Sequence, residues 1–175
     1  MHKRRNRIST LFVIIILFGF ISCKKQSPQL PSNKGLTVDK NVTSLLAINQ
    51  NLAKKEDRTL KQFALQKDKA FKRSEIGFWY IINESGNKSR LKDSVSCKIS
   101  CKLMSLKGKI LQDDEQQIII GKKQVVLGLE EGLKLMNKGD SATFIIPWYL
   151  AYGMKGNEPS IPPYTSIIYE IKVFN

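Results

Sequence analysis

The chain has 175 residues, of which 42% are hydrophobic and 25% charged, which is typical of one globular domain of ordinary size with an extension. Its formal net charge of +14 favours anionic surfaces such as lipid headgroups, envelope polymers or nucleic acid. A nucleic-acid-binding protein would need a recognition motif or a basic stripe interleaved with aromatic residues, and the sequence contains neither. We therefore interpret the charge as a solvated basic surface.

The N-terminus has the pattern of a secretory signal. Met1–Arg7 is basic, and the apolar run Leu11–Ile21 that follows is too short to span a bilayer, which takes about 20 apolar residues. Ser22 and Cys23 come directly after this run, and a small residue before cysteine is the pattern that lipoprotein signal peptidase cleaves. We predict a signal peptide at residues 1–22 and a diacylated Cys23; the alternative is an ordinary signal peptide with an incidental cysteine.

The next two segments are predicted to be a tether and a helical prefix. Residues 23–35, which start with the lipidated cysteine, contain two prolines and no apolar pattern. Residues 36–75 contain neither glycine nor proline, and their apolar residues fall near helical spacing in two groups. We predict one or two short helices here, which form either a dimerisation or docking arm or a prefix that packs on the following domain or is partly mobile.

Residues 76–175 show strand patterns around one short helical segment. Val95–Leu103 and Ser166–Phe174 alternate apolar and polar residues, as strands with one buried face do. Other extended segments are predicted at Gly77–Ile82, Ile110–Leu111, Ile118–Ile120 and Ala142–Ile146, and a helix at Leu129–Met136. We therefore predict an α+β domain in which an antiparallel β-sheet wraps around a short helix.

The cysteines of this domain are predicted to be free. Cys97 and Cys101 lie four residues apart on one predicted strand, about 13 Å, whereas the Cα atoms of a disulfide lie within about 7 Å. Both thiols are expected in the core. No metal site is predicted, because the only histidine is His2, inside the signal segment.

A series of short motifs runs from Gly121 to Phe174. In chain order they are Val125–Leu133 (VVLGLEEGL), Met136 with Gly139, Ile146–Pro147 followed by Ala151–Gly153 (AYG), Ile161–Pro163 (IPP) and Ile167–Ile171 (IIYEI). This series resembles the signature of the FKBP-type peptidyl-prolyl cis-trans isomerases, with the blocks in that family's order and spacing. The prefix ending in Gly77–Tyr80 is also similar to the gliding-motility-associated isomerase lipoproteins of gram-negative bacteria.

The resemblance implies an FKBP-like fold with an apolar pocket for a proline ring, and neither a cofactor nor a metal. It assigns catalytic positions to Tyr152, Val126, Leu129 and Tyr169, and substrate-binding positions to Cys101, Leu111, Gln112, Val125 and Ile161. In such a pocket the Val126 amide would donate to the substrate carbonyl, Leu129 would form the floor, and the Tyr152 hydroxyl would reach the ligand. Ile161 would lie in a loop over the site.

Several of these positions differ from the residues usual in the family. Leu129 stands where tryptophan is common and Leu111 where phenylalanine is, while Cys101 and Gln112 replace a hydrogen-bonded tyrosine–aspartate pair. Gln116 stands where another aromatic residue is common. These substitutions predict a looser pocket, and they keep open a second interpretation: a non-catalytic chaperone or assembly module of an envelope machine.

We predict a prolyl isomerase that assists the folding of exported proteins and accepts an apolar residue before proline. Its expected partners are proline-containing polypeptides in the periplasm and the membrane that holds its lipid anchor, and nucleic acid is not among them. Lys24 after Cys23 resembles the sorting signal of lipoproteins of the outer membrane, so the domain is expected to be anchored there and to face the periplasm.

Overall fold

The computed structural model of the chain describes residues 40–84 and 89–174. The described elements belong almost entirely to one compact unit that starts at Thr43. The predicted signal peptide, Cys23 and the tether lie outside the described residues. Among the helices that are described, none combines the length and the apolar character that a membrane crossing requires.

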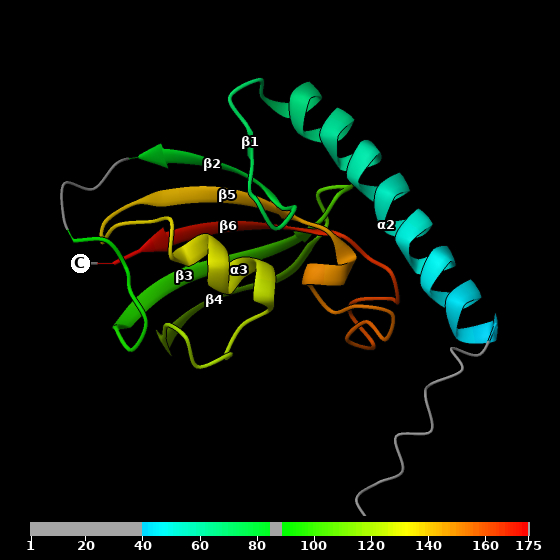
Figure 1. Ribbon diagram of the computed structural model, residues 1–175. Helices are drawn as coiled ribbons and strands as arrows, with labels where there is room; N and C mark the ends of the chain where they lie inside the picture. Colours follow the sequence, from blue (N-terminus) through cyan, green and yellow to red (C-terminus); the bar gives the residue numbers. More distant parts are fainter. Residues whose placement is uncertain (1–39, 85–88, 175) are drawn as a thin grey trace, which may run out of the picture. The chain divides into compact units, whose positions relative to one another are not determined.

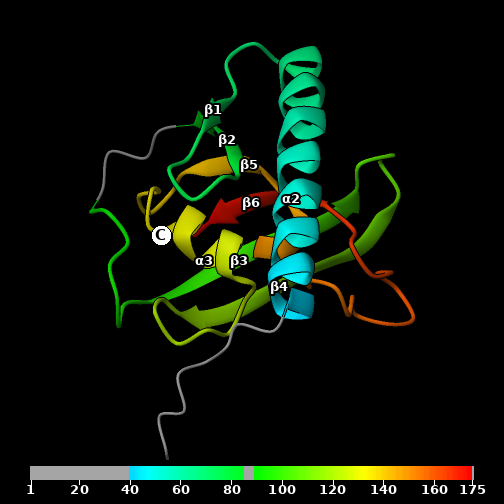
Figure 2. The same cartoon turned by 45° about the vertical axis from the view of Figure 1, so that its right-hand side comes forward.

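One long helix, α2 (Lys40–Lys67, 28 residues), occupies the segment for which one or two short helices were predicted. Without glycine or proline, nothing interrupts the helical hydrogen bonds between its two apolar groups. Leu60 and Ala64, one turn apart, are fully buried in a cluster with Trp79 and Ile145 of the sheet. The C-terminal half of α2 is therefore a packed prefix, and Figures 1 and 2 show the helix alongside the sheet.

Six antiparallel strands form a single sheet in the order β1-β2-β5-β6-β3-β4 (Figure 1). The strands are β1 (Lys72–Arg73), β2 (Trp79–Glu84), β3 (Ser96–Ser105), β4 (Ile110–Ile119), β5 (Ser141–Ile146) and β6 (Ile167–Val173). The alternating patterns correctly predicted β3 and β6, which pair with each other in the middle of the sheet. The sequence did not predict β1, because two residues carry no readable pattern.

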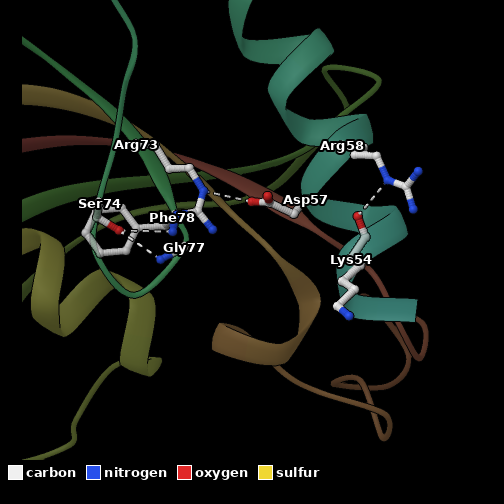
Figure 3. Close-up of polar contacts among 7 residues, drawn as sticks. All are labelled: Lys54, Asp57, Arg58, Arg73, Ser74, Gly77 and Phe78. Carbon is white, nitrogen blue, oxygen red and sulfur yellow. Dashed lines mark hydrogen bonds and ion pairs between the residues drawn. The ribbon is translucent and has the colours of Figure 1, made fainter. Parts of the chain in front are cut away.

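Polar contacts tie β1 to α2 and shape the turn that follows (Figure 3). Arg73 Nε donates to Asp57 Oδ1 of α2 at 2.9 Å. The Ser74 hydroxyl oxygen accepts hydrogen bonds from the N–H groups of Gly77 at 3.2 Å and Phe78 at 3.0 Å. Gly77 has φ +107°, a conformation that only glycine adopts without strain. The chain therefore reverses sharply between β1 and β2, which pair as antiparallel neighbours.

The edge strand β4 is continuous where two short extended segments were predicted. As an edge strand, β4 pairs only with β3 and exposes its outward-facing side chains to water. Its polar middle residues can therefore form a strand without the alternation of apolar residues that a sequence prediction relies on. The register shifts after Leu103, which leaves Leu111 without a partner on β3. Because of this bulge the successive residues Leu111 and Gln112 both lie on one side of the sheet, Leu111 against the core and Gln112 near Cys101.

The sheet buries side chains on both of its faces. Helix α3 (Leu127–Leu133), shorter than the predicted Leu129–Met136, covers one face, as the predicted wrapping of a sheet around a helix requires. The other face carries the contact with α2, whose buried members are Leu60, Ala64, Phe71, Trp79, Met104, Ile145 and Ile168. Phe144 and Ile145, successive residues of β5, belong to different clusters because neighbouring side chains on a strand point to opposite faces.

Two glycines let α3 lie directly against β5. A Cβ atom on Gly128 would lie 2.5 Å from Cγ2 of Ile146, and one on Gly132 would lie 2.7 Å from Cε1 of Phe144. The two glycines are one helical turn apart and therefore share a face of the helix. The helix backbone thus approaches the strand more closely than any larger residue would allow, and this contact positions the N-terminal end of α3.

Replacing Gly132 by alanine tests this contact. Alanine is a better helix former by about 1 kcal/mol, but the fully buried Phe144 ring cannot retreat into solvent from the new methyl group. Overpacking of this kind costs about 1–3 kcal/mol, and a methyl group that would meet three atoms of the Phe144 ring at 2.7, 2.9 and 3.1 Å falls at the upper end. After subtraction of the helix-forming gain, we expect Gly132→Ala to lower the free energy of unfolding by about 2 kcal/mol in urea titrations. Leu127→Ala, at a position in the same helix that is 55% exposed, is the control and should change it little. A Gly132→Ala variant as stable as the natural chain would contradict the tight contact.

Candidate active site

A cavity of about 320 Å³ opens on the α3 side of the sheet. Its lining comes from β3, β4, the loop before α3, the segment after the short helix η1 (Trp148–Leu150), and β6. The lining residues are Cys101, Gln112, Gln116, Lys123, Gln124, Val125, Val126, Tyr152 and Tyr169. Segments far apart in the sequence therefore converge on one space.

Two tyrosine hydroxyls meet at this cavity. The oxygens of Tyr152 and Tyr169 are 3.2 Å apart, and either can be the hydrogen-bond donor. Burial, and then the hydrogen bond to Tyr152, raise the pKa of Tyr169 far above its usual value. Tyr169 therefore stays protonated at physiological pH. Because each hydroxyl has one proton and the pair uses only one of them, one proton remains to be donated elsewhere.

Side chains fix the loop that leads into α3. The buried Glu130 carboxylate accepts a hydrogen bond from the Lys123 N–H at 3.3 Å, and Gln124 Oε1 accepts one from the Ile119 N–H at 2.6 Å. Lys123 itself has φ +54°, a conformation that few residues other than glycine and asparagine favour. Side-chain hydrogen bonds, and not regular secondary structure, therefore hold this loop in its unusual backbone conformation.

This loop presents the backbone of Val126 to the cavity. The Val126 carbonyl caps α3 by accepting from the N–H groups of Leu129 and Glu130, each at 3.0 Å. Within the described part of the chain, the N–H of Val126 has no hydrogen-bond partner of its own. A donor without a partner beside a cavity can bind a carbonyl oxygen that enters it.

The structure brings together six of the nine residues predicted to act in or line the site. Cys101, Gln112, Val125, Val126, Tyr152 and Tyr169 all line the cavity. Leu129 and Ile161 do not line it; both side chains are buried in the core cluster. Leu111 lines a neighbouring hollow instead. Leu129 thus supports the cavity from within the core and does not form its exposed floor.

Three lining residues were not among the predicted site positions. Gln116, Lys123 and Gln124 add amide and ammonium groups to the cavity. Gln116 lies four residues along β4 from Gln112 and stands where an aromatic residue is common in the family that the motifs resemble. For Lys123 and Gln124, the only signal in the sequence was their position directly before Val125. Among the described residues, no group of three or more His, Cys, Asp or Glu side chains is arranged to hold a metal ion. The lining therefore combines hydrogen-bonding side chains with the apolar side chains of Val125 and Val126.

Comparison with known proteins identifies the domain that carries this cavity. Residues 86–174 match the model of the family described as FKBP-type peptidyl-prolyl cis-trans isomerase. The chain belongs to the FKBP family. A Haemophilus influenzae protein named "Probable FKBP-type peptidyl-prolyl cis-trans isomerase" is 31% identical over 70% of this chain and 52% of its own length. The isomerase FkpA of Escherichia coli is 30% identical over 62% of this chain and 41% of its own length, so the chain spans about half the length of these curated relatives.

Solved FKBP structures share the fold. A peptidyl-prolyl cis-trans isomerase from Pseudomonas syringae superposes with a TM-score of 0.61 at 24% identity, covering 70% of this chain and 92% of its own. FkpA from Escherichia coli also superposes with a TM-score of 0.61 at 24% identity, covering 95% of this chain and 81% of its own. The predicted FKBP-like fold with an N-terminal helix is confirmed.

One side of this FKBP cavity has a hydrogen-bond arrangement that the sequence did not predict. Cys101 and Gln112 were expected to replace a bonded pair, but Gln112 Nε2 donates to Asp114 Oδ2 at 3.0 Å. The Cys101 thiol instead forms a hydrogen bond with the side chain of Gln116. Burial, opposed by that bond, raises the pKa of Cys101 to about 11. The cavity therefore holds a neutral thiol at physiological pH.

The two domain thiols should be unreactive in the folded FKBP domain. Burial raises the pKa of both Cys97 and Cys101, and only the thiolate is nucleophilic. In a Cys23→Ser variant at pH 8 we expect Ellman's reagent to modify both at least about 100-fold more slowly in buffer than in guanidinium chloride. The rate should rise as the pH approaches 11, because the folded-state pKa of Cys101 lies there. A rapid phase in the native protein at pH 8 would contradict the neutral, buried thiol.

Proposed function

We propose that this domain is a peptidyl-prolyl cis-trans isomerase. The observation that carries the proposal is the convergence of the unpartnered Val126 N–H and the Tyr152–Tyr169 pair on one cavity. Family membership and curated relatives with that activity support it.

The cavity could accelerate rotation of an X-Pro amide without covalent chemistry. Rotation meets a barrier of about 18–20 kcal/mol because the C–N bond has partial double-bond character. Twisting the amide removes this resonance and lowers the polarity of the carbonyl, so surroundings poor in water favour the twisted state over the planar one. In this proposal the Val126 N–H holds the substrate carbonyl, the ring of Tyr169 contacts the proline, and Tyr152 donates to the bound chain.

The substrate is proposed to carry an apolar residue before proline, and Val125 offers it an apolar wall. Gln112, Gln116 and Lys123 make the opposite side polar, which suits the backbone of a bound polypeptide. The polar side and the missing aromatic residues at positions 111 and 129 predict modest catalytic efficiency.

A protease-coupled assay on a prolyl tetrapeptide tests the activity. We expect kcat/KM to fall about 2- to 10-fold in Tyr152→Phe, which loses one hydrogen bond. We expect a fall of at least about 10-fold in Leu129→Ala, because a void in the fully buried core loosens the cavity walls. Leu65→Ala, at a position on α2 that is 41% exposed, is the control for truncation of a leucine and should leave the rate unchanged.

Melting curves separate loss of the site from loss of folding in the Leu129→Ala variant. Turnover no faster than the uncatalysed rate in the natural chain would reject the enzyme, and unchanged rates in both site variants would place the site elsewhere.

A second candidate function is that of a non-catalytic chaperone or assembly module of an envelope machine, such as a gliding or secretion apparatus. The N-terminal half of α2 favours it, because Leu45, Leu46 and Ile48 are 60%, 55% and 51% exposed. Refolding of a protein whose slow phase is limited by proline isomerisation separates the two functions. An isomerase accelerates that phase, whereas a chaperone only suppresses aggregation.

We also propose that the chain is a lipoprotein of the outer membrane whose domain faces the periplasm and assists the folding of exported proteins. The basic and apolar pattern of the N-terminus and Cys23 support this location.

Labelling with radioactive palmitate in a gram-negative host tests the anchor. The natural chain should take up label and sediment with outer membranes, because two acyl chains give stable anchoring. Cys23→Ser should remain unlabelled and lose this anchoring, while Cys97→Ser, which changes a buried thiol, is the matched control. Equal labelling of the natural chain and Cys23→Ser would overturn the proposal.

A further inference from the structure

A second recess lies beside the candidate site, between α2, the turn that joins β3 to β4, and the segment before β6. It consists of two adjoining hollows of about 590 Å³ and 390 Å³, which share Glu56 and Tyr164. We call it the Tyr164 groove; its lining includes Leu52, Leu106, Leu111, Trp148, Pro159, Pro162 and Tyr164, with Lys55, Lys107 and Lys109. The groove borders the candidate cavity along β4, because Leu111 lines the groove and the next residue, Gln112, lines the cavity.

Interlocking contacts hold the walls of the groove in place. Ser166 donates from its hydroxyl to the Glu56 carboxylate, and its oxygen accepts from the Trp148 N–H at 3.0 Å. The rings of Trp148 and Tyr164 pack edge to face with centroids 4.9 Å apart. Because α2, η1 and the segment before β6 are joined in this way, the groove is a built recess rather than a gap between independent loops.

The backbone conformation of Tyr164 in the groove is energetically unfavourable. It has φ +55°, a conformation in which an aromatic residue is unusual and which glycine or asparagine adopts more easily. Its side chain is nevertheless 47% exposed, so burial in the core does not explain the ring. An exposed aromatic ring held against Trp148 in a strained backbone is a suitable contact for a bound chain.

The charges at the groove favour an acidic occupant. Lys55, Lys107 and Lys109 are exposed and outnumber the one carboxylate in the lining, that of Glu56, which accepts a hydrogen bond from Ser166. An apolar floor with lysines at its edge matches a segment in which apolar residues alternate with aspartate or glutamate.

We propose that the Tyr164 groove binds an extended acidic and apolar segment of the client polypeptide, next to the proline held in the candidate cavity. This substrate preference rests on the proposed isomerase function, because it assigns the groove to the same bound chain. An extended chain gains about 3.3 Å per residue, so a segment of several residues on one side of the proline can pass from Gln112 over Leu111 into the groove.

Binding of a labelled proline-free peptide tests the groove independently of catalysis. The probe is a fluorescein-labelled peptide of alternating leucine and aspartate, titrated by anisotropy against the full-length chain in a non-ionic detergent. We expect binding that weakens with salt and that falls about 10-fold or more in the double variant Lys107→Glu/Lys109→Glu. Lys61→Glu/Lys67→Glu, which makes the same charge change at exposed positions of α2 outside the groove, should bind as the natural chain does.

Tyr164→Gly removes the ring at a position whose backbone glycine prefers, so the fold should persist and binding should fall several-fold. Circular dichroism confirms folding of each variant. Equal binding by the natural chain and both groove variants, an equal loss in the Lys61/Lys67 control, or no binding at all would overturn the proposal.

A kinetic comparison links the groove to the candidate cavity. A prolyl substrate extended by leucine and aspartate should have a lower KM than the tetrapeptide in the natural chain, and this advantage should vanish in the groove variants while tetrapeptide turnover is unchanged. An extended substrate with no advantage would overturn the proposal. Groove binding without any tetrapeptide turnover would reject the isomerase and support the groove as a polypeptide site of the second candidate function.

Discussion

The close contact between α3 and β5 is the constraint on which the site depends. Gly128 and Gly132 present bare backbone to Ile146 and Phe144, so the helix lies nearer the sheet than side chains would allow. The same helix begins at the Val126 carbonyl and carries Glu130, whose buried carboxylate holds the loop through Lys123. A helix moved outward would displace both the Val126 N–H and that loop, and the cavity would lose one wall. Packing in the core therefore decides the geometry of a site at the surface.

The parts of the fold predicted correctly from the sequence are those whose own residues carry a pattern. β3 and β6 alternate apolar and polar residues, β5 is an apolar run that ends before Pro147, and α3 has an apolar stripe. β4 lies at the sheet edge with a polar middle, and only pairing with β3 defines it as a strand. The length of α2 depends on the absence of breaking residues and on burial of Leu60 against strands that follow it in sequence. Such tertiary effects are invisible to local periodicity.

The candidate site was predicted in outline because the motifs that carry it occur in order. Tyr152 and Val126 meet at the cavity as the resemblance implied, but the resemblance also placed Leu129 at an exposed floor, and the structure buries it. Leu111 has no partner on β3, and the bulge at this register shift determines where its side chain lies. No residue type in the sequence predicts such a bulge. Several polar side chains lie near one another on β3 and β4, and the sequence does not show which of them pair. Only the three-dimensional structure shows that Cys101 bonds to Gln116 and Gln112 to Asp114.

The contact of α2 with the sheet has a consequence for where this protein can be cut. The family match starts at residue 86, yet Met104, Ile145 and Ile168 inside it pack in one cluster with Leu60, Ala64 and Trp79, which lie before it. A fragment trimmed to the matched residues would expose these large apolar side chains to water, and such surfaces favour association. We therefore expect the smallest piece that folds alone to include the C-terminal half of α2, which packs on the sheet, and to be larger than the range that matches the family.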